Sequence, residues 1–150
     1  MAWRRCSDVG QAKMAKWLMK TEPGDYSWDQ LLADGKTEWD GVRNHQAAAN
    51  MKAMRKGDRG FFYRSLKDPA VLGIFEVTRE AFADPDDPDG KWVRVEVAPV
   101  EALPNEVSLK AIKGDQRLAD LALVRQSRLS VMPVSDAHWA LIIAMADPGG

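Results

Sequence analysis

The chain has 150 residues, a length typical of one domain, and it carries a formal net charge of −1. So weak a charge argues against sequence-blind clamping of nucleic acid, which needs a strong positive field. No apolar run approaches the roughly 20 residues that span a bilayer, and the single Cys6 excludes a disulfide framework and a Cys-rich metal site.

The first segment, residues 1–14, lacks hydrophobic periodicity and predicts a poorly ordered N-terminal extension before a domain at 15–146. It has no apolar stretch of the kind that a secretory signal requires. Because a lone free thiol fits a reducing compartment, we expect a cytoplasmic protein. The run "AKWLMK" then predicts a first strand.

Two short helices are predicted next. Ser27 caps the first helix, with Gln30 as its capping-box partner and Gly35 at its end. The run "NHQAAANMKAM" predicts the second helix, which ends at Gly57 with two basic residues in its last turn. Between the helices, "WDGVRN" at 39–44 predicts a loop that carries an aromatic, a cationic and an amide side chain.

The middle of the chain changes to the period of two that strands show. The pattern appears in "DRGFFYRS", "VLGIFEVTRE" and "KWVRVEVAPV", and the Pro/Asp/Gly segment "ADPDDPDG" predicts a turn before the last of them. One apolar and one polar face favour antiparallel strands with one solvated side.

The last third returns to helices. Ser108 caps "LKAIKGD", and Ser135 caps the closing helix "DAHWALIIAMA". Between them, "LALVRQSRLSVMPV" combines a loop with a short final strand. Since strands and helices do not alternate regularly, the pattern favours an α+β domain around a small curved antiparallel sheet or barrel.

Motifs for catalysis, metals or cofactors are missing from the sequence. His45 and His138 belong to no ligand-spaced pair. Asp40, His45 and Ser65 supply the residue types of a nucleophilic triad, but no nucleophile elbow accompanies them. There is also no Walker A or dinucleotide-binding glycine motif. We therefore predict a protein that is not an enzyme and that uses no metal and no cofactor.

Aromatic and polar residues instead form a constellation that a planar base requires. An aromatic face stacks on a base, amides and hydroxyls read its edge, and cations hold phosphate. Core packing is the simpler reading for four aromatic residues, Trp17, Phe62, Trp92 and Trp139. For Trp39 and Tyr63, packing and binding remain equally open.

Four motifs, in this order, resemble the EVE domain family of the PUA-like group. They are "WLMKTEP", "WDGVRNHQAAANMKAMRKGDRGFFYRS", "GIFEV" and "RQSRLSVMPVSDAHW", and the resemblance runs from Ala15 to Met145. It implies a PUA-like pseudo-barrel of antiparallel strands flanked by short helices. It also implies a reader that encloses a modified base in an aromatic and polar pocket, either a modified cytosine in DNA or a modified base in RNA.

The same resemblance implies ligand-binding roles for the residues that match the family's motifs. These are Lys20, Thr21, Trp39, Asn44, Tyr63, Ser65, Arg125, Gln126 and Ser127. Arg43 lies in the same loop as Trp39, where it either pairs within the protein or contacts a phosphate. Arg64 replaces the family's usual His, and by strand alternation we expect it to point outward, opposite Tyr63 and Ser65.

We therefore expect a monomer whose partner is a nucleic acid that carries a modified base. One alternative is a protein-interaction module with a vestigial pocket. Another is a hydrolase acting on modified nucleic acid, with Glu22, Asp40 or His45 as candidate groups. If the loop reads a base, Trp39→Ala and Asn44→Ala should weaken binding while the melting temperature stays nearly unchanged.

Overall fold

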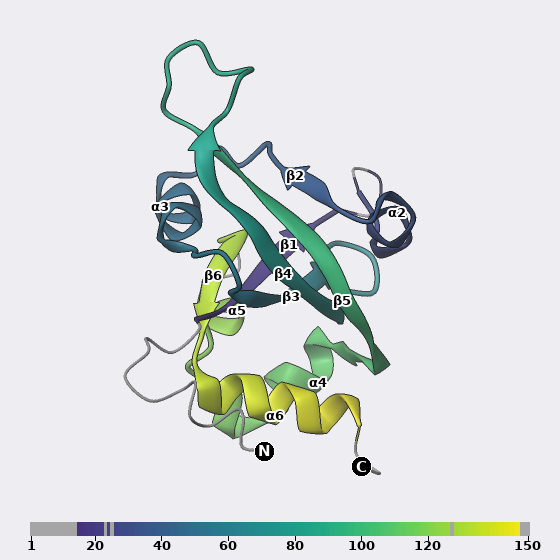
Figure 1. Ribbon diagram of the computed structural model, residues 1–150. Coiled ribbons are helices and arrows are strands. Elements are labelled where there is room, and N and C mark those ends of the chain that lie inside the picture. Colours follow the sequence, from purple (N-terminus) through teal and green to yellow (C-terminus); the bar gives the residue numbers. More distant parts are fainter. Residues whose placement is uncertain (1–14, 23, 25, 127, 148–150) are drawn as a thin grey trace, which may run out of the picture.

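The computed structural model describes residues 15–22, 24, 26–126 and 128–147. It confirms an α+β domain in which short helices flank one six-stranded sheet (Figure 1). Strands in the sheet follow the order β2-β5-β4-β3-β1-β6. The predicted extension at 1–14 and the predicted ligand residue Ser127 lie outside the described residues.

The strands are β1 (Lys16–Thr21), β2 (Thr37–Trp39), β3 (Arg59–Arg64), β4 (Ala70–Ala83), β5 (Val93–Ser108) and β6 (Val131–Val134). Four of the five strand pairings in the described part are antiparallel, as expected. The pairing of β1 with β3 is parallel, which the sequence did not predict. Parallel neighbours need a long crossover, and the segment with α2, β2 and α3 provides it.

Local capping signals place most of the helices. The α-helices are α2 (Trp28–Asp34), α3 (His45–Ala53), α4 (Leu109–Lys113), α5 (Ala122–Arg125) and α6 (Asp136–Ala146), with a 3₁₀ turn η1 at Gln116–Leu118. The capping box of Ser27 and Gln30 is present, and Gly35 ends α2 in the left-handed conformation. Ser108 and Ser135 accept hydrogen bonds from the first turns of α4 and α6.

Helix α3 ends earlier than the sequence predicts. It stops at Ala53, and the two basic residues and Gly57 lie in a turn beyond it. Asp58 explains the early end, because its carboxylate accepts the backbone N–H of Arg55 at 2.9 Å and the indole N–H of Trp17 at 3.0 Å. The bond to Arg55 closes a turn after the helix, and this turn leads into β3.

Strand β3 lies inside the sheet, and both of its faces are buried. Phe61, Phe62 and Tyr63 are all buried although they alternate in direction. Phe61 stacks on Trp139 of α6, with ring centroids 3.9 Å apart, and Phe62 meets Trp28 on the other face at 5.3 Å. The expectation of one solvated face is therefore wrong for this strand, because helices cover both sides of it.

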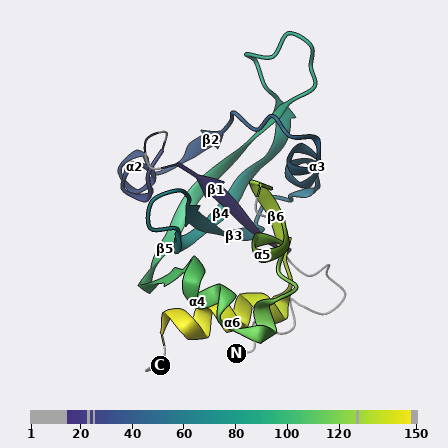
Figure 2. The ribbon, with the colours of Figure 1, turned by 180° about the vertical axis from the view of Figure 1, so that it is seen from behind.

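Strands β4 and β5 form a long ribbon whose tip projects from one end of the molecule, while α4 and α6 lie at the opposite end (Figure 1). Helices α2 and α3 lie on opposite sides of the sheet as viewed in Figures 1 and 2. The three-residue strand β2 pairs with β5 at the sheet edge. Trp39 ends this strand, so the predicted loop begins one residue later than expected.

Candidate functional site

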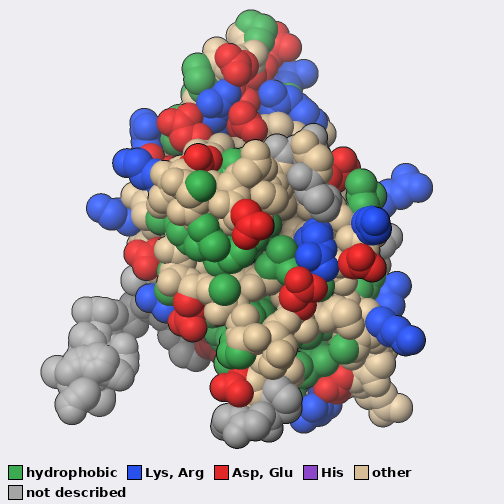
Figure 3. Space-filling view, turned by 90° about the vertical axis from the view of Figure 1, so that its right-hand side faces the viewer, with side chains coloured by type: hydrophobic (Ala, Val, Ile, Leu, Met, Phe, Trp, Pro, Cys, Tyr) green, Lys and Arg blue, Asp and Glu red, His purple; other side chains and the backbone are tan. Residues whose placement is uncertain are grey.

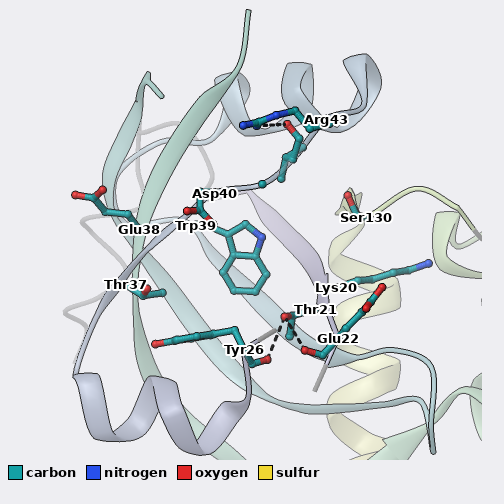
Figure 4. Close-up of a pocket in the computed structure, with 12 residues that line it drawn as sticks. Lys20, Thr21, Glu22, Tyr26, Thr37, Glu38, Trp39, Asp40, Arg43 and Ser130 are labelled. Carbon is teal, nitrogen blue, oxygen red and sulfur yellow. Dashed lines mark hydrogen bonds between the residues drawn. The ribbon is translucent and has the colours of Figure 1, made fainter. Parts of the chain in front are cut away.

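A cavity of about 610 Å³ opens between the ends of β1 and β2 and the start of the segment that leads to α3 (Figure 4). Its lining consists of Lys20, Thr21, Glu22, Tyr26, Thr37, Glu38, Trp39, Asp40, Gly41, Val42, Arg43 and Ser130. Four residues predicted from the sequence, Lys20, Thr21, Trp39 and Arg43, are thus brought together. The volume lies within the range of ligand pockets in proteins.

Trp39 is the aromatic wall of this cavity, and the core fixes its position. Its side chain is only 8% exposed. Its ring meets Phe62 edge to face at 5.7 Å and lies nearly parallel to Phe75 at 6.3 Å. Trp39 therefore serves both readings that the sequence left open, since it packs in the core and lines the cavity.

Polar groups surround this wall on the β1 side. Lys20 is half-buried, and burial lowers the pKa of its ammonium group. Its backbone N–H donates to the carbonyl of Ser130 at 2.8 Å, which places the Ser130 side chain next to it in the lining. The Thr21 hydroxyl donates to the carbonyl of Tyr26 at 3.0 Å. The cavity thus offers a cation and two hydroxyls close to an indole.

Arg43 is held inside the protein while it lines the cavity. Its guanidinium donates to the buried carboxylate of Asp84 at 3.2 Å and lies 5.7 Å from the ring centroid of Trp92. Asp84 also accepts from Arg94 at 3.1 Å. The backbone N–H of Asp86 and the two guanidiniums lower the pKa of the Asp84 carboxyl. Of the two roles that the sequence left open, the structure has the internal ion pair.

Acidic side chains form another part of the lining, where the sequence indicated Glu22 and Asp40 only as candidate groups of a hydrolase. Glu38 and Asp40 pair with Arg94 at 3.0 and 3.7 Å. Glu22 makes no ion pair or side-chain hydrogen bond within the described residues, and Figure 4 shows it beside Lys20. Carboxylates accept hydrogen bonds from exocyclic amino groups of bases, so an unpaired one at the rim is a potential base reader.

Tyr26 is a further lining residue that sequence reasoning missed. Its hydroxyl donates to Asp34 at 2.7 Å. Partial burial, first, and this hydrogen bond raise the pKa of the Tyr26 phenol. It follows the Pro-Gly break after β1, and two hydrogen bonds across that turn bring it to the cavity: the Thr21 hydroxyl donates to its carbonyl, and its backbone N–H donates to the carbonyl of Glu22 at 3.0 Å. No periodic signal in the sequence marks that contact.

Asn44 and Gln126 do not line this cavity. They lie in a separate recess of about 280 Å³ together with Gln46, Arg128 and Leu129. The Asn44 side chain accepts the backbone N–H of Ala47 at 2.9 Å and so caps α3. The need of the helix for an N-cap therefore directs this amide away from Trp39.

Tyr63, Ser65 and Arg125, the other predicted ligand residues that the structure describes, do not line the cavity. Tyr63 is 2% exposed, and its burial raises its pKa to about 12; Lys20 Nζ is 5.9 Å from its ring centroid. Ser65 donates its hydroxyl to the Thr21 carbonyl at 3.0 Å, so it supports a lining residue. Arg125 is exposed and pairs with Asp120 at 3.2 Å.

Of the residues that could suggest catalysis, Glu22 and Asp40 line the cavity, whereas His45 and Ser65 do not. His45 packs on Trp92 with ring centroids 5.0 Å apart, and no hydrogen bond joins it to Asp40 or Ser65 in the described structure. Arg64 does not line the cavity, which agrees with the outward direction expected from strand alternation, and it pairs with Glu106 at 2.8 Å. None of the described helices is long and apolar enough to cross a membrane.

Comparisons with known proteins agree with the fold and the motifs. The model of the family "EVE domain" matches residues 15–145. Thymocyte nuclear protein 1 of Rattus norvegicus is 30% identical over 165 residues, which cover 87% of this chain and 73% of that protein. The NMR structure of a Rhodopseudomonas palustris protein is 45% identical with a TM-score of 0.86, and covers 91% of this chain and 96% of that chain.

A human relative was solved with a nucleic acid. The crystal structure of human THYN1 protein in complex with 5-methylcytosine containing DNA is 28% identical to this chain, with a TM-score of 0.83. The match covers 89% of this chain and 98% of that chain. The family match alone spans most of the sequence, and the shared fold agrees with it. The chain therefore belongs to the EVE domain family.

Proposed function

We propose that this protein is a non-enzymatic reader that binds nucleic acid and encloses one modified nucleobase in the cavity beside Trp39. The observation that carries the proposal is the juxtaposition of the fixed indole with Lys20, Thr21 and Ser130 around a volume of about 610 Å³. A planar heterocycle needs an apolar ring surface and hydrogen-bonding groups at its edge, and this lining supplies both.

The charges around the cavity support recognition of a base over recognition of the backbone. The lining has three carboxylates and two cations, and Arg43 is already paired with Asp84. A surface that clamps phosphates would show an excess of cations. Affinity is therefore expected to come from enclosing one base that has left its stack.

The human relative supports the same chemical class, because its crystal structure contains DNA with 5-methylcytosine. We accordingly place modified cytosine in DNA, or a modified base in RNA, among the ligands of this chain. A reader of this kind needs no activated nucleophile, and the Asp40, His45 and Ser65 side chains are not arranged as one.

Binding to matched oligonucleotides tests the proposal. DNA and RNA strands with cytosine or 5-methylcytosine, and strands with other methylated bases, are titrated with the full chain at fixed salt. We expect one modified strand to bind about tenfold or more tightly than its unmodified counterpart, and to remain intact after long incubation. Equal affinity for every strand, or release of a product, would contradict the proposal.

A pair of lysine variants checks that the cavity is the site. Lys20→Met removes the cation in the lining, whereas Lys110→Met removes an exposed cation on α4, outside this cavity. We expect the first to abolish most of the preference for the modified strand and the second to leave it unchanged. A loss that is equal in both variants would assign the effect to general charge attraction.

A further inference from the structure

The connection between β3 and β4 presents an apolar side chain to solvent in an unusual backbone conformation. Leu66 is 69% exposed, and it is the most exposed large hydrophobic residue in the part of the chain that the structure describes. Its φ is 70°, and the φ of Asp68 is 50°. Left-handed backbone is uncommon for residues other than glycine, and a bulky residue there indicates that its surroundings enforce the conformation.

Hydrogen bonds hold both ends of this connection. Ser65 donates its backbone N–H at 2.9 Å and its hydroxyl at 3.0 Å to the carbonyl of Thr21. The Arg64 guanidinium donates twice to the carbonyl of Asp68, at 2.9 and 2.6 Å. The exposure of Leu66 is therefore a feature of an anchored loop.

The loop is joined through Thr21 to the cavity that the proposed function uses, and Arg64 and Asp68 at its ends line neighbouring recesses. Thr21, which holds its first residue, lines that cavity. Figures 1 and 2 both show the β3–β4 connection beside helix α2. On this side of the molecule, apolar side chains are exposed among charged ones (Figure 3). Lys67, which follows Leu66, is exposed and available to a phosphate.

We propose that Leu66 is a wedge that enters the base stack of a nucleic-acid duplex while the flipped base occupies the cavity. This inference rests on the proposed function. A base that leaves a duplex opens a gap, and proteins that distort duplexes insert apolar side chains such as Leu between base steps. An anchored loop presents such a side chain at low entropic cost. The ligand is then a duplex with one modified base, because a single strand has no paired stack to fill.

Leu66→Ala tests the wedge, and Leu32→Ala is its matched control. Leu32 is the other exposed large hydrophobic among the described residues, at 49%, and it lies on helix α2. Both substitutions remove an exposed side chain, so both variants are expected to keep the melting temperature of the wild type. The probes are a duplex with one 5-methylcytosine next to 2-aminopurine, and the same modified strand alone.

We expect Leu66→Ala to bind the duplex about tenfold more weakly than the wild type. The rise in 2-aminopurine fluorescence that reports unstacking should shrink, while the affinity for the single strand stays unchanged. Leu32→Ala should match the wild type in all three measurements. This pattern separates a role in opening the duplex from a role in holding the base.

Four other outcomes would overturn the wedge. An unchanged duplex affinity with the full fluorescence rise, or an equal loss on duplex and single strand, would do so and leave the reader proposal intact. A changed oligomeric state of Leu66→Ala in sedimentation would assign the side chain to a contact between copies. If the wild type binds neither modified probe more tightly than its unmodified counterpart, the reader proposal fails for this base and the wedge fails with it.

Discussion

Two tryptophans pack against adjacent residues of β3 on opposite faces of the sheet. Trp39 meets Phe62 edge to face at 5.7 Å, and Trp139 stacks on Phe61 at 3.9 Å. Successive side chains of a strand alternate in direction, which puts the two rings on opposite sides of β3. Trp39 is buried and Trp139 is only half-buried, yet Trp39 is the one that lines the cavity.

The difference between the two tryptophans lies in their neighbours. Lys16 Nζ lies 5.6 Å from the ring centroid of Trp139, and this ring packs between its own helix α6 and Phe61 of β3. Trp39 shares its surroundings with Lys20 and Ser130 across an open volume. An aromatic residue is thus a candidate for base binding when polar groups surround an open volume beside its ring. A choice by exposure alone would favour Trp139.

Trp39→Ala should have the largest effect, because it removes a core ring and the cavity wall together. We expect it to lose about 3–5 kcal/mol of unfolding free energy in denaturant titrations, as core Trp or Phe truncations do. It should also abolish the preference for a modified strand. The expectation from the sequence that stability would stay unchanged is therefore replaced, because the ring is buried against Phe62 and Phe75.

Trp139→Ala is the control that separates a binding defect from a loss of stability. Because the ring is only half-buried, we expect a smaller loss of about 2 kcal/mol, and binding should be retained at temperatures where the variant is folded. If Trp139→Ala lost the modified-strand preference as fully as Trp39→Ala, the binding defect would follow from lost stability. The contrast between the two faces would then be broken.

Asp84→Asn tests the charged side of the cavity, because it removes the buried carboxylate that pairs with Arg43 and Arg94. The Asp86 backbone N–H, Arg43 and Arg94 hold the pKa of Asp84 below its ordinary value of 3.8. A depressed carboxyl pKa stabilises the fold at neutral pH, and this contribution is lost as the pH falls through the folded-state pKa. Unfolding free energies measured below about pH 5 should therefore fall more steeply in the wild type than in Asp84→Asn.

The outcome for the cavity follows from the same pair. Asn at position 84 has no charge to hold Arg43, so the guanidinium is expected to move and the variant to bind the modified strand more weakly at neutral pH. Asp120→Asn is the control, because Asp120 forms an exposed pair with Arg125 outside the cavity. Parallel pH profiles of wild type and Asp84→Asn would show that the buried carboxylate does not stabilise the fold as its contacts imply.

Local signals explain why much of the fold was predictable from the sequence. Ser27, Ser108 and Ser135 each cap the helix that the sequence places after them. Strand β2 escaped prediction because three residues show no periodicity, and only pairing with β5 defines them. The parallel pairing of β1 with β3 escaped for a similar reason, since strand order depends on contacts between distant segments.

The predictions for the site succeeded and failed for the same reasons as those for the fold. Lys20, Thr21 and Trp39 were predicted because the resemblance to the family named them, and the fold brings them together. Asn44 shared the motif of Trp39, but helix capping, a local need, turned its side chain elsewhere. Ser130 was missed because nothing in the sequence shows that the residue before β6 lies against Lys20; a long-range backbone hydrogen bond decides it.

Ser130→Ala should have the smallest effect, and it isolates one hydroxyl of the lining. The backbone bond from Lys20 to residue 130 persists in the variant. Within the described residues the Ser130 hydroxyl makes no hydrogen bond, so the unfolding free energy should stay within about 0.5 kcal/mol of the wild type. Binding of the modified strand should weaken about threefold to tenfold, the usual worth of one hydrogen bond.

Ser65→Ala provides the opposite signature. Its hydroxyl is bonded to the Thr21 carbonyl inside the protein, so its loss should cost about 1 kcal/mol of stability and change binding little. Calorimetric titration with the modified strand, paired with denaturant curves, measures both quantities for each variant.

If Ser130→Ala bound every strand as the wild type does, the hydroxyl would face solvent in the complex. The reading edge of the base would then have to lie toward Glu22 and Lys20, the remaining polar groups at that rim.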